Sequence, residues 1–192
     1  MDITFWGAAR TVTGSQHLVT ASGQRLLLDC GLYQGRRVDT YARNLNFRYS
    51  PRSIDAVILS HAHIDHAGNL PNLVKQGYEK SIFATHATVD LASLMIRDSG
   101  RIQESDAEFV NKKRARRGED PIDPLYTEQD AEEVAGMFKG VNYGEAFQPI
   151  PGVIARFYEA GHILGSAGVS LEIEGKGKKI RLWFSGDIGR YQ

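Results

Sequence analysis

The sequence predicts an α/β fold, in which strands and helices alternate along one domain. An apolar run at 54–59 leads into a polar loop, a helical segment at 69–76 and a second short apolar run at 81–84, an order typical of α/β domains. Longer helical patterns fill the middle of the chain, and the last third returns to strands. With 192 residues and an apolar fraction of 42%, the chain is long enough to bury one sizeable core.

The first third is predicted to be rich in strands. Gly23-Gln24 marks a tight connection between two of them, and Gly31 follows the end of the next one. Residues 33–53 are polar and include Gly35 and Pro51, so we expect an irregular segment there. The expected strands are Ile3–Trp6, His17–Thr20, Arg25–Leu28 and Ile54–Leu59.

The first two predicted helices follow the apolar run at 54–59. Asn69 can cap the first helix, which tolerates Pro71 in its first turn, runs to Gln76 and stops at Gly77. The second covers residues 88–117, with an apolar stripe in its first half and a more polar second half.

A third helix is predicted to begin at Thr127, because apolar residues recur at helical spacing after it. These residues are Ala131, Val134, Ala135 and Phe138. Near the end of the chain, Gly175-Lys176-Gly177-Lys178 is typical of a hairpin turn. The remaining expected strands are Ser81–Ala84, Val153–Tyr158, Gly168–Ile173 and Lys179–Ser185.

The charge distribution excludes a whole-molecule basic surface for nucleic acid, because 23 basic side chains balance 23 acidic ones. A local basic groove remains compatible with this balance. The basic run at 112–117 is most often a solvated helix face, and contact with a phosphate backbone is the minority interpretation.

Cysteine usage and the N-terminal sequence favour an intracellular protein. Cys30 is the only cysteine, so no internal disulfide is possible and a reducing compartment is expected. Met1-Asp2-Ile3-Thr4 does not open a secretory signal, and no apolar run is long enough to span a bilayer. We therefore expect a soluble cytoplasmic protein without a membrane partner.

A cluster of metal-binding residue types follows the apolar run at 54–59. His61 and His63 alternate along an extended chain, so they can face one metal together. Asp65 and His66 then turn into a helix and can face a second metal. Imidazole and carboxylate are zinc ligands, and three histidines within six residues are far denser than the chain's total of six predicts.

Two further candidates lie far away in the sequence. His162 follows the expected strand at 153–158, and Asp187 follows the strand at 179–185. Active groups in α/β folds commonly follow strand ends. Given the cluster at 61–66, we expect both His162 and Asp187 to be ligands. His17, by contrast, fits a structural role in a strand, and His86 matches no ligand motif.

The motif His61-Ala62-His63-Ile64-Asp65-His66 resembles that of the metallo-β-lactamase superfamily. Three flanking segments resemble the β-CASP branch of that superfamily, which contains RNA-processing nucleases. They are Val12-Thr13-Gly14-Ser15, Leu28-Asp29-Cys30-Gly31 and Gly161-His162-Ile163-Leu164-Gly165-Ser166-Ala167. The resemblance covers essentially the whole chain and implies β-sheets flanked by helices, the αββα sandwich.

By position, the resemblance implies two zinc sites. One zinc would take His61, His63 and His162. The other would take Asp65 and His66, with Asp187 bridging the two. Asp65 would also orient the attacking water during catalysis. Asp29 would hold a ligand histidine or its loop without touching metal, and the alternative for Asp29 is a strand-end turn residue.

The family pattern also has parts that this sequence does not contain. It includes a further ligand histidine near its C-terminus and a β-CASP insert that supplies the leaving-group acid. We therefore expect residues 1–192 to be an N-terminal portion, with a missing C-terminal half or a complementing chain as a partner. We expect such a chain to bind zinc but to cleave RNA poorly.

Three functions remain open from the sequence. The first is a zinc-dependent RNA phosphodiesterase, and the second is a two-metal hydrolase of a small ester, thioester or lactam, because one fold serves many substrates. The third is a non-catalytic scaffold. Mn²⁺ or iron could replace zinc on the same nitrogen and oxygen ligands. The residues that would bind RNA outside the metal site are unknown from the sequence.

Overall fold

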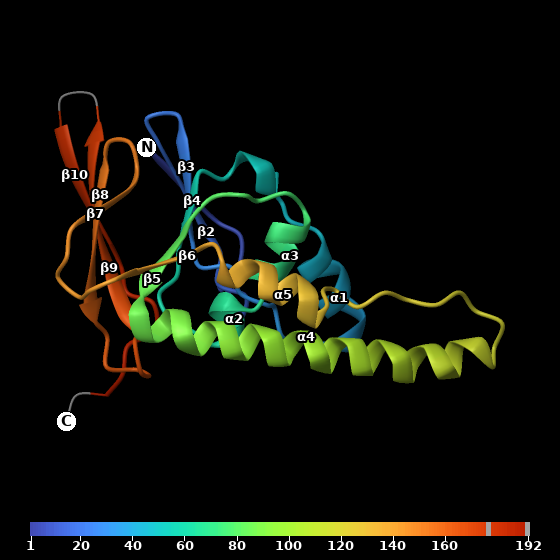
Figure 1. Ribbon diagram of the computed structural model, residues 1–192. Helices are drawn as coiled ribbons and strands as arrows, with labels where there is room; N and C mark the ends of the chain where they lie inside the picture. The colour runs from blue at the N-terminus through green and yellow to red at the C-terminus, as the bar shows by residue number, and fades with distance from the viewer. Residues whose placement is uncertain (176–177, 191–192) are drawn as a thin grey trace.

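Two β-sheets and a layer of helices make up the structure (Figure 1). The computed structural model describes residues 1–175 and 178–190. The predicted hairpin turn at 175–178 therefore lies partly outside the described residues. Among the described residues, the order of layers is helices, first sheet and second sheet, which are three of the four layers of an αββα sandwich.

The first sheet has the strand order β1-β2-β3-β4-β5-β6. β1 to β3 pair antiparallel, whereas β4, β5 and β6 each join in parallel. The parallel part directs the carboxyl ends of β3 to β6 to the same edge of the sheet. The strands are β1 Asp2–Phe5, β2 His17–Ala21, β3 Gln24–Leu28, β4 Ala56–Ile58, β5 Ile82–Thr85 and β6 Phe138–Val141.

The second sheet is antiparallel throughout, in the order β10-β9-β8-β7. Because β8 and β10 both pair antiparallel with β9, they run in the same direction and end at the same edge. The strands are β7 Phe147–Ile150, β8 Val153–Glu159, β9 Ala167–Gly175 and β10 Lys178–Phe184.

The helices lie on the face of the first sheet that is turned away from the second sheet (Figure 1). The long helix α4 runs along this face, and its C-terminal end projects beyond the other helices and strands. Within the described residues, no helix combines the length and apolar character needed to cross a membrane. The helices are α1 Arg37–Leu45, α2 Ile64–Ala67, α3 Leu70–Lys75, α4 His86–Ala115 and α5 Glu128–Ala135, with a 3₁₀ turn, η1, at Pro51–Ser53.

The side chains of the first sheet contribute to two apolar cores, one on each face of the sheet. Successive side chains point to opposite faces. Leu27 and Val57 pack towards the helices, while Leu26, Leu28 and Ile58 pack towards the second sheet. All five side chains are almost completely buried. The first sheet is thus covered on both faces, which fixes the loops that follow its carboxyl ends.

The prediction of an irregular segment at 33–53 was wrong, because this segment contains α1 and η1. Polar bonds hold α1 in place: the Asn44 side chain accepts from Tyr33 N and donates to Tyr33 O, at 2.8 and 2.9 Å. The Asn69 and Asn72 side chains donate to Asn44 O. The sequence did carry a helical signal, since the apolar residues Val38, Tyr41, Ala42 and Leu45 recur at i, i+3, i+4 and i+7, and the polar composition of the segment obscured it.

Two boundaries in the sequence prediction also need correction. Phe138 does not continue the third helix, because α5 ends before Gly136 and Phe138 begins strand β6 beside Ile82. The side chain of Asn69 does not cap α3, since its amide nitrogen donates to Asn44 O instead. Strand β7, with Pro149 inside it, was not predicted.

Candidate metal centre

The predicted site residues follow the ends of strands from both sheets. Asp29 follows β3, and His61, His63 and the short helix α2 follow β4. His162 follows β8 and Asp187 follows β10. Backbone hydrogen bonds join these loops: Ala167 N donates to Ser60 O at 2.9 Å, and Gly189 N donates to Ala160 O at 2.9 Å. The two sheets therefore present one shared edge.

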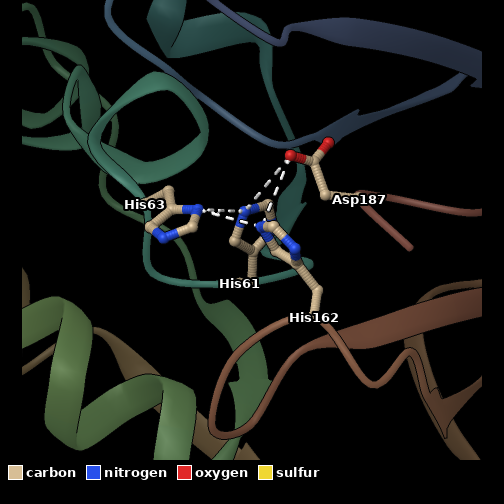
Figure 2. A group of neighbouring side chains, drawn as sticks. All are labelled: His61, His63, His162 and Asp187. Atoms are coloured by element: carbon tan, nitrogen blue, oxygen red, sulfur yellow. Dashed lines mark hydrogen bonds and ion pairs between the residues drawn. The ribbon is translucent and has the colours of Figure 1, made fainter. Parts of the chain in front are cut away.

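Four side chains converge at this edge (Figure 2). The His63 Nδ1 atom lies 3.1 Å from His61 Nε2 and 3.1 Å from His162 Nε2. Asp187 Oδ2 approaches from the other side, 3.5 Å from His162 Nε2 and 4.0 Å from His61 Nε2. All four potential ligand atoms lie within 4.8 Å of one another.

His66 meets this group through Asp187, but Asp65 is not part of it. The His66 Nε2 atom lies 3.3 Å from Asp187 Oδ1, so the two oxygens of Asp187 face different histidines. Asp65 is half-buried one residue before His66, and its charge contributes to raising the pKa of His66. Asp65 and His66 thus lie beside the four-residue group rather than inside it.

Asp29 is a completely buried carboxylate that connects the strand ends. Its Oδ1 atom accepts from Ser60 N at 2.7 Å. Its Oδ2 atom lies 2.7 Å from His66 Nδ1 and accepts from Ser60 Oγ at 2.9 Å and from Ser15 Oγ at 3.2 Å. The backbone of Asp29 adopts a left-handed φ of 60°, a conformation that aspartate tolerates better than most residues. Asp29 therefore orients His66 and holds the start of the His61 loop.

Burial and the neighbouring charges move the two buried histidines in opposite directions. Burial lowers the pKa of His61 to about 4, and a charge on His66 adds to this effect. Burial also opposes the charged form of His66, but the hydrogen bond that His66 Nδ1 donates to Asp29 and the charges of Asp29 and Asp187 outweigh it and raise the pKa of His66. His61 is thus neutral and available as a ligand at pH 7.

The backbone of the α2 segment is held by two loops, one that precedes strand β2 and one that follows strand β3. Cys30 N donates to His66 O at 2.8 Å, and Ser15 N donates to Asp65 O at 2.8 Å. Gly31 lies so close to the Asp65 carbonyl that any Cβ at position 31 would collide with it. Glycine at position 31 is therefore required for the approach that positions Asp65 and His66.

The donor set fits a divalent metal ion. Ligand atoms 2.0–2.1 Å from a tetrahedral zinc lie about 3.3 Å apart. The separations of 3.1 to 4.0 Å between His63, His61, His162 and Asp187 are close to this value. The His63 Nδ1 atom cannot form a good hydrogen bond with both neighbouring histidines, because a neutral imidazole nitrogen carries either one proton or one lone pair. His162 and Asp187 are partly exposed, at 25% and 47% of the side chain, which leaves the centre open to solvent.

Sequence reasoning missed the role of Ser60. Its hydroxyl lies 3.0 Å from His61 Nδ1 while it also donates to Asp29, so it connects the buried carboxylate to a second histidine. The signal was present in the sequence, since Ser60 directly precedes His61 at the end of a strand. His17, by contrast, packs between the rings of Phe5 and Phe184, which agrees with a structural role.

Comparisons with known proteins match this fold. The model of the metallo-beta-lactamase superfamily matches residues 9–167. A solved beta-lactamase from Chitinophaga pinensis superposes with a TM-score of 0.53 at 14% identity, covering 94% of this chain and 58% of that one. This likeness shows the fold.

Two curated relatives are more similar in sequence. Ribonuclease TTHA0252 of Thermus thermophilus is 38% identical over 190 residues, which is 98% of this chain and 38% of the relative. Transcription termination factor FttA of Methanocaldococcus jannaschii is 30% identical over 186 residues, 97% of this chain and 27% of the relative. The chain thus spans between about a quarter and two fifths of the length of these relatives.

Proposed function

Because the chain belongs to the metallo-beta-lactamase superfamily, we propose that it is the metal-binding part of a zinc-dependent hydrolase that cleaves RNA phosphodiester bonds. The observation that carries this proposal is the convergence of His61, His63, His162 and Asp187 at one solvent-open edge. The name of the ribonuclease relative agrees with the RNA-processing branch that the sequence motifs predicted.

His61, His63 and His162 would hold one metal ion, and Asp65 and His66 a second, with Asp187 between them. The arrangement of Asp187 supports the bridging role, because its two oxygens face His162 and His66 separately. Metal ions held there would act as Lewis acids towards a phosphate oxygen and make an attacking water more acidic.

Other residues would orient these groups and the water. Asp29 keeps the Nδ1 atom of His66 engaged, so that Nε2 faces the centre. We assign Asp65 the task of accepting a hydrogen bond from the attacking water, because its charge lies beside His66 at the same edge. The half-exposed Asp187 and His162 form the side from which a phosphate can enter.

Metal analysis tests the proposed ligands. We expect the purified chain to retain about two zinc ions when the second site is competent. His63→Ala should lose most of the bound zinc, whereas Asp90→Asn, an exposed change on α4, should retain the wild-type content. Equal metal content in both variants would contradict the ligand assignment. Reconstitution with Mn²⁺ and Fe²⁺ in parallel tests the identity of the metal.

Substrate class is tested by offering a labelled single-stranded RNA, a lactam and a thioester side by side. We expect zinc-dependent RNA cleavage that is slow for this 192-residue chain, is stopped by a chelator and is absent in His63→Ala. Cleavage of the lactam or thioester without RNA cleavage would favour a small-molecule hydrolase. Persistence of RNA cleavage in His63→Ala would indicate a contaminating nuclease.

A further inference from the structure

A cavity of about 550 Å³ adjoins the candidate metal centre and shares His162 with it. It lies where the chain leaves strands β5, β6 and β8, beside the loop of residues 161–165. Its volume is in the range of sites that take a small organic group. Ligands of α/β sheets commonly bind outside the carboxyl ends of parallel strands. None of the proposed metal ligands other than His162 lines this cavity.

The rings of Tyr143 and His86 form two of its walls. The hydroxyl of Tyr143 donates to Ser166 O at 2.9 Å, which ties this half-exposed ring to the loop that carries His162. The imidazole of His86 lies directly against Gly140 of strand β6, where any Cβ would displace it. Gly140 therefore provides the space that His86 occupies.

Polar and apolar groups complete the lining. Glu159 and Asn142 supply a carboxylate and an amide, which can accept and donate hydrogen bonds. Burial, followed by the nearby charge of Glu159, raises the pKa of Tyr143, so Glu159 lies close to that ring. Leu164 is 75% exposed at the same cavity and adds an apolar surface.

We propose that this cavity binds one nucleobase of the RNA strand whose phosphate meets the metal centre, with the base stacked on Tyr143 beside His86. This inference rests on the proposed function. A flat heterocycle fits the combination of aromatic rings, an apolar rim and hydrogen-bonding groups at its edge. Stacking on aromatic rings is how proteins bind the bases of single strands with little sequence preference. The shared His162 places base and phosphate next to each other.

The test measures binding of a short phosphorothioate-linked oligoadenylate, labelled with fluorescein, to the zinc-loaded full chain by fluorescence anisotropy. Tyr143→Leu should weaken binding about 5- to 100-fold, the loss expected for one stacked base. Tyr143→Phe keeps the ring and should bind within about twofold of wild type. Tyr41→Leu is the matched control, because Tyr41 is similarly exposed, at 41% against 44% for Tyr143, and also donates to a backbone carbonyl. It should leave binding unchanged.

A scan of oligonucleotides with one abasic position separates base contact from a structural effect. In the wild type, one position should lose affinity when its base is removed. In Tyr143→Leu the same removal should cost much less affinity than in the wild type, because the stacking contact with Tyr143 is already lost. Gly140→Ala, which displaces His86 without changing Tyr143, should weaken the same position. Zinc content and melting temperature confirm that the variants are folded.

The outcomes distinguish this inference from the proposed function. If the wild type binds the oligonucleotide and cleaves RNA with zinc, but no abasic position couples to Tyr143, only the base-binding cavity is overturned. If neither binding nor zinc-dependent cleavage of RNA is seen in the wild type, both are overturned. Coupling at one position, with Tyr41→Leu unchanged, supports the cavity.

Discussion

At the scale of single residues, the centre depends on one buried carboxylate. Asp29 has no solvent contact, and it accepts hydrogen bonds from four donors on Ser15, Ser60 and His66. Only a carboxylate offers two acceptor oxygens to so many donors. Removing its charge would leave buried donors unpaired, which costs more than the bonds contribute when they are formed.

Asp29→Asn is therefore expected to destabilise the metal-free protein by about 2–4 kcal/mol, because the amide would turn an NH₂ group towards other donors. Loss of the His66 contact should also weaken metal binding by about 10- to 100-fold. Chemical denaturation and competition with a chelating dye measure the two effects. Wild-type stability in this variant would contradict the inference that Asp29 holds the loops together. Asp90→Asn again serves as the control.

The lowered pKa of His61 predicts a pH dependence of stability. Between pH 6.5 and about 4, the unfolded chain binds a proton at His61 that the folded metal-free protein excludes. Its free energy of unfolding should therefore fall as the pH falls through this range. His66 has a raised pKa, so its contribution is complete below pH 6.5 and is lost only as the pH rises above that value. Urea unfolding of wild type and His61→Asn across this range tests the sign, and equal slopes would contradict it.

At the scale of elements, the loop that carries His61 and His63 follows a very short strand. β4 has only three residues, Ala56–Ile58, yet it lies in the middle of the first sheet between β3 and β5. The segment after it is fixed by backbone bonds to residues 30–32, including Leu32 N to Ile64 O at 2.9 Å. The positions of the ligands thus depend on close contact between two loops.

Gly31→Ala tests this contact. The added methyl group would collide with the Asp65 carbonyl, so the 64–66 segment must move away from Asp29. We expect a loss of stability of at least about 1–3 kcal/mol, as for other overpacked sites, together with reduced zinc content. Gly118→Ala is a useful comparison, because position 118 has open space around it and also has a positive φ of 67°. Gly118→Ala should lose stability only through the strain of alanine at a positive φ, and it should retain the wild-type zinc content.

At the scale of the whole molecule, the proposed ligands come from both sheets. His61 and His63 follow the first sheet, whereas His162 and Asp187 follow the second. The sheets pack against each other through a continuous apolar core that includes Phe157, Val169 and Leu171. A metal ion bound by all four residues would link the two sheets at their shared edge.

Metal binding should therefore stabilise the fold as a whole. At a free zinc concentration about 100 times its dissociation constant, the gain should be about 2.7 kcal/mol for one site. Thermal unfolding with and without a chelator measures this gain. His63→Ala, on the first sheet, and His162→Ala, on the second, should each abolish most of it. A gain that survives in His162→Ala would mean that the metal does not join the two sheets.

The sequence by itself determined where most of the strands and helices lie and which candidate ligands follow the strands. The eight strands and three helices expected from apolar patterns are present in the structure, with shifts of one to three residues at most of their ends. The motif at 61–66 was recognised locally, because its spacing is set by a few consecutive residues. The family also followed from the motifs, and the superfamily model over residues 9–167 confirms it.

Only the tertiary structure decided how those strand ends meet. The proximity of His162 and Asp187 to His61 depends on the packing of two sheets, and no local pattern contains that packing. The same holds for Phe138, where pairing with β5 prevails over a helical spacing. The cavity that His162 shares with Tyr143 and His86 was likewise invisible, because walls built from distant residues leave no periodic signal in the chain.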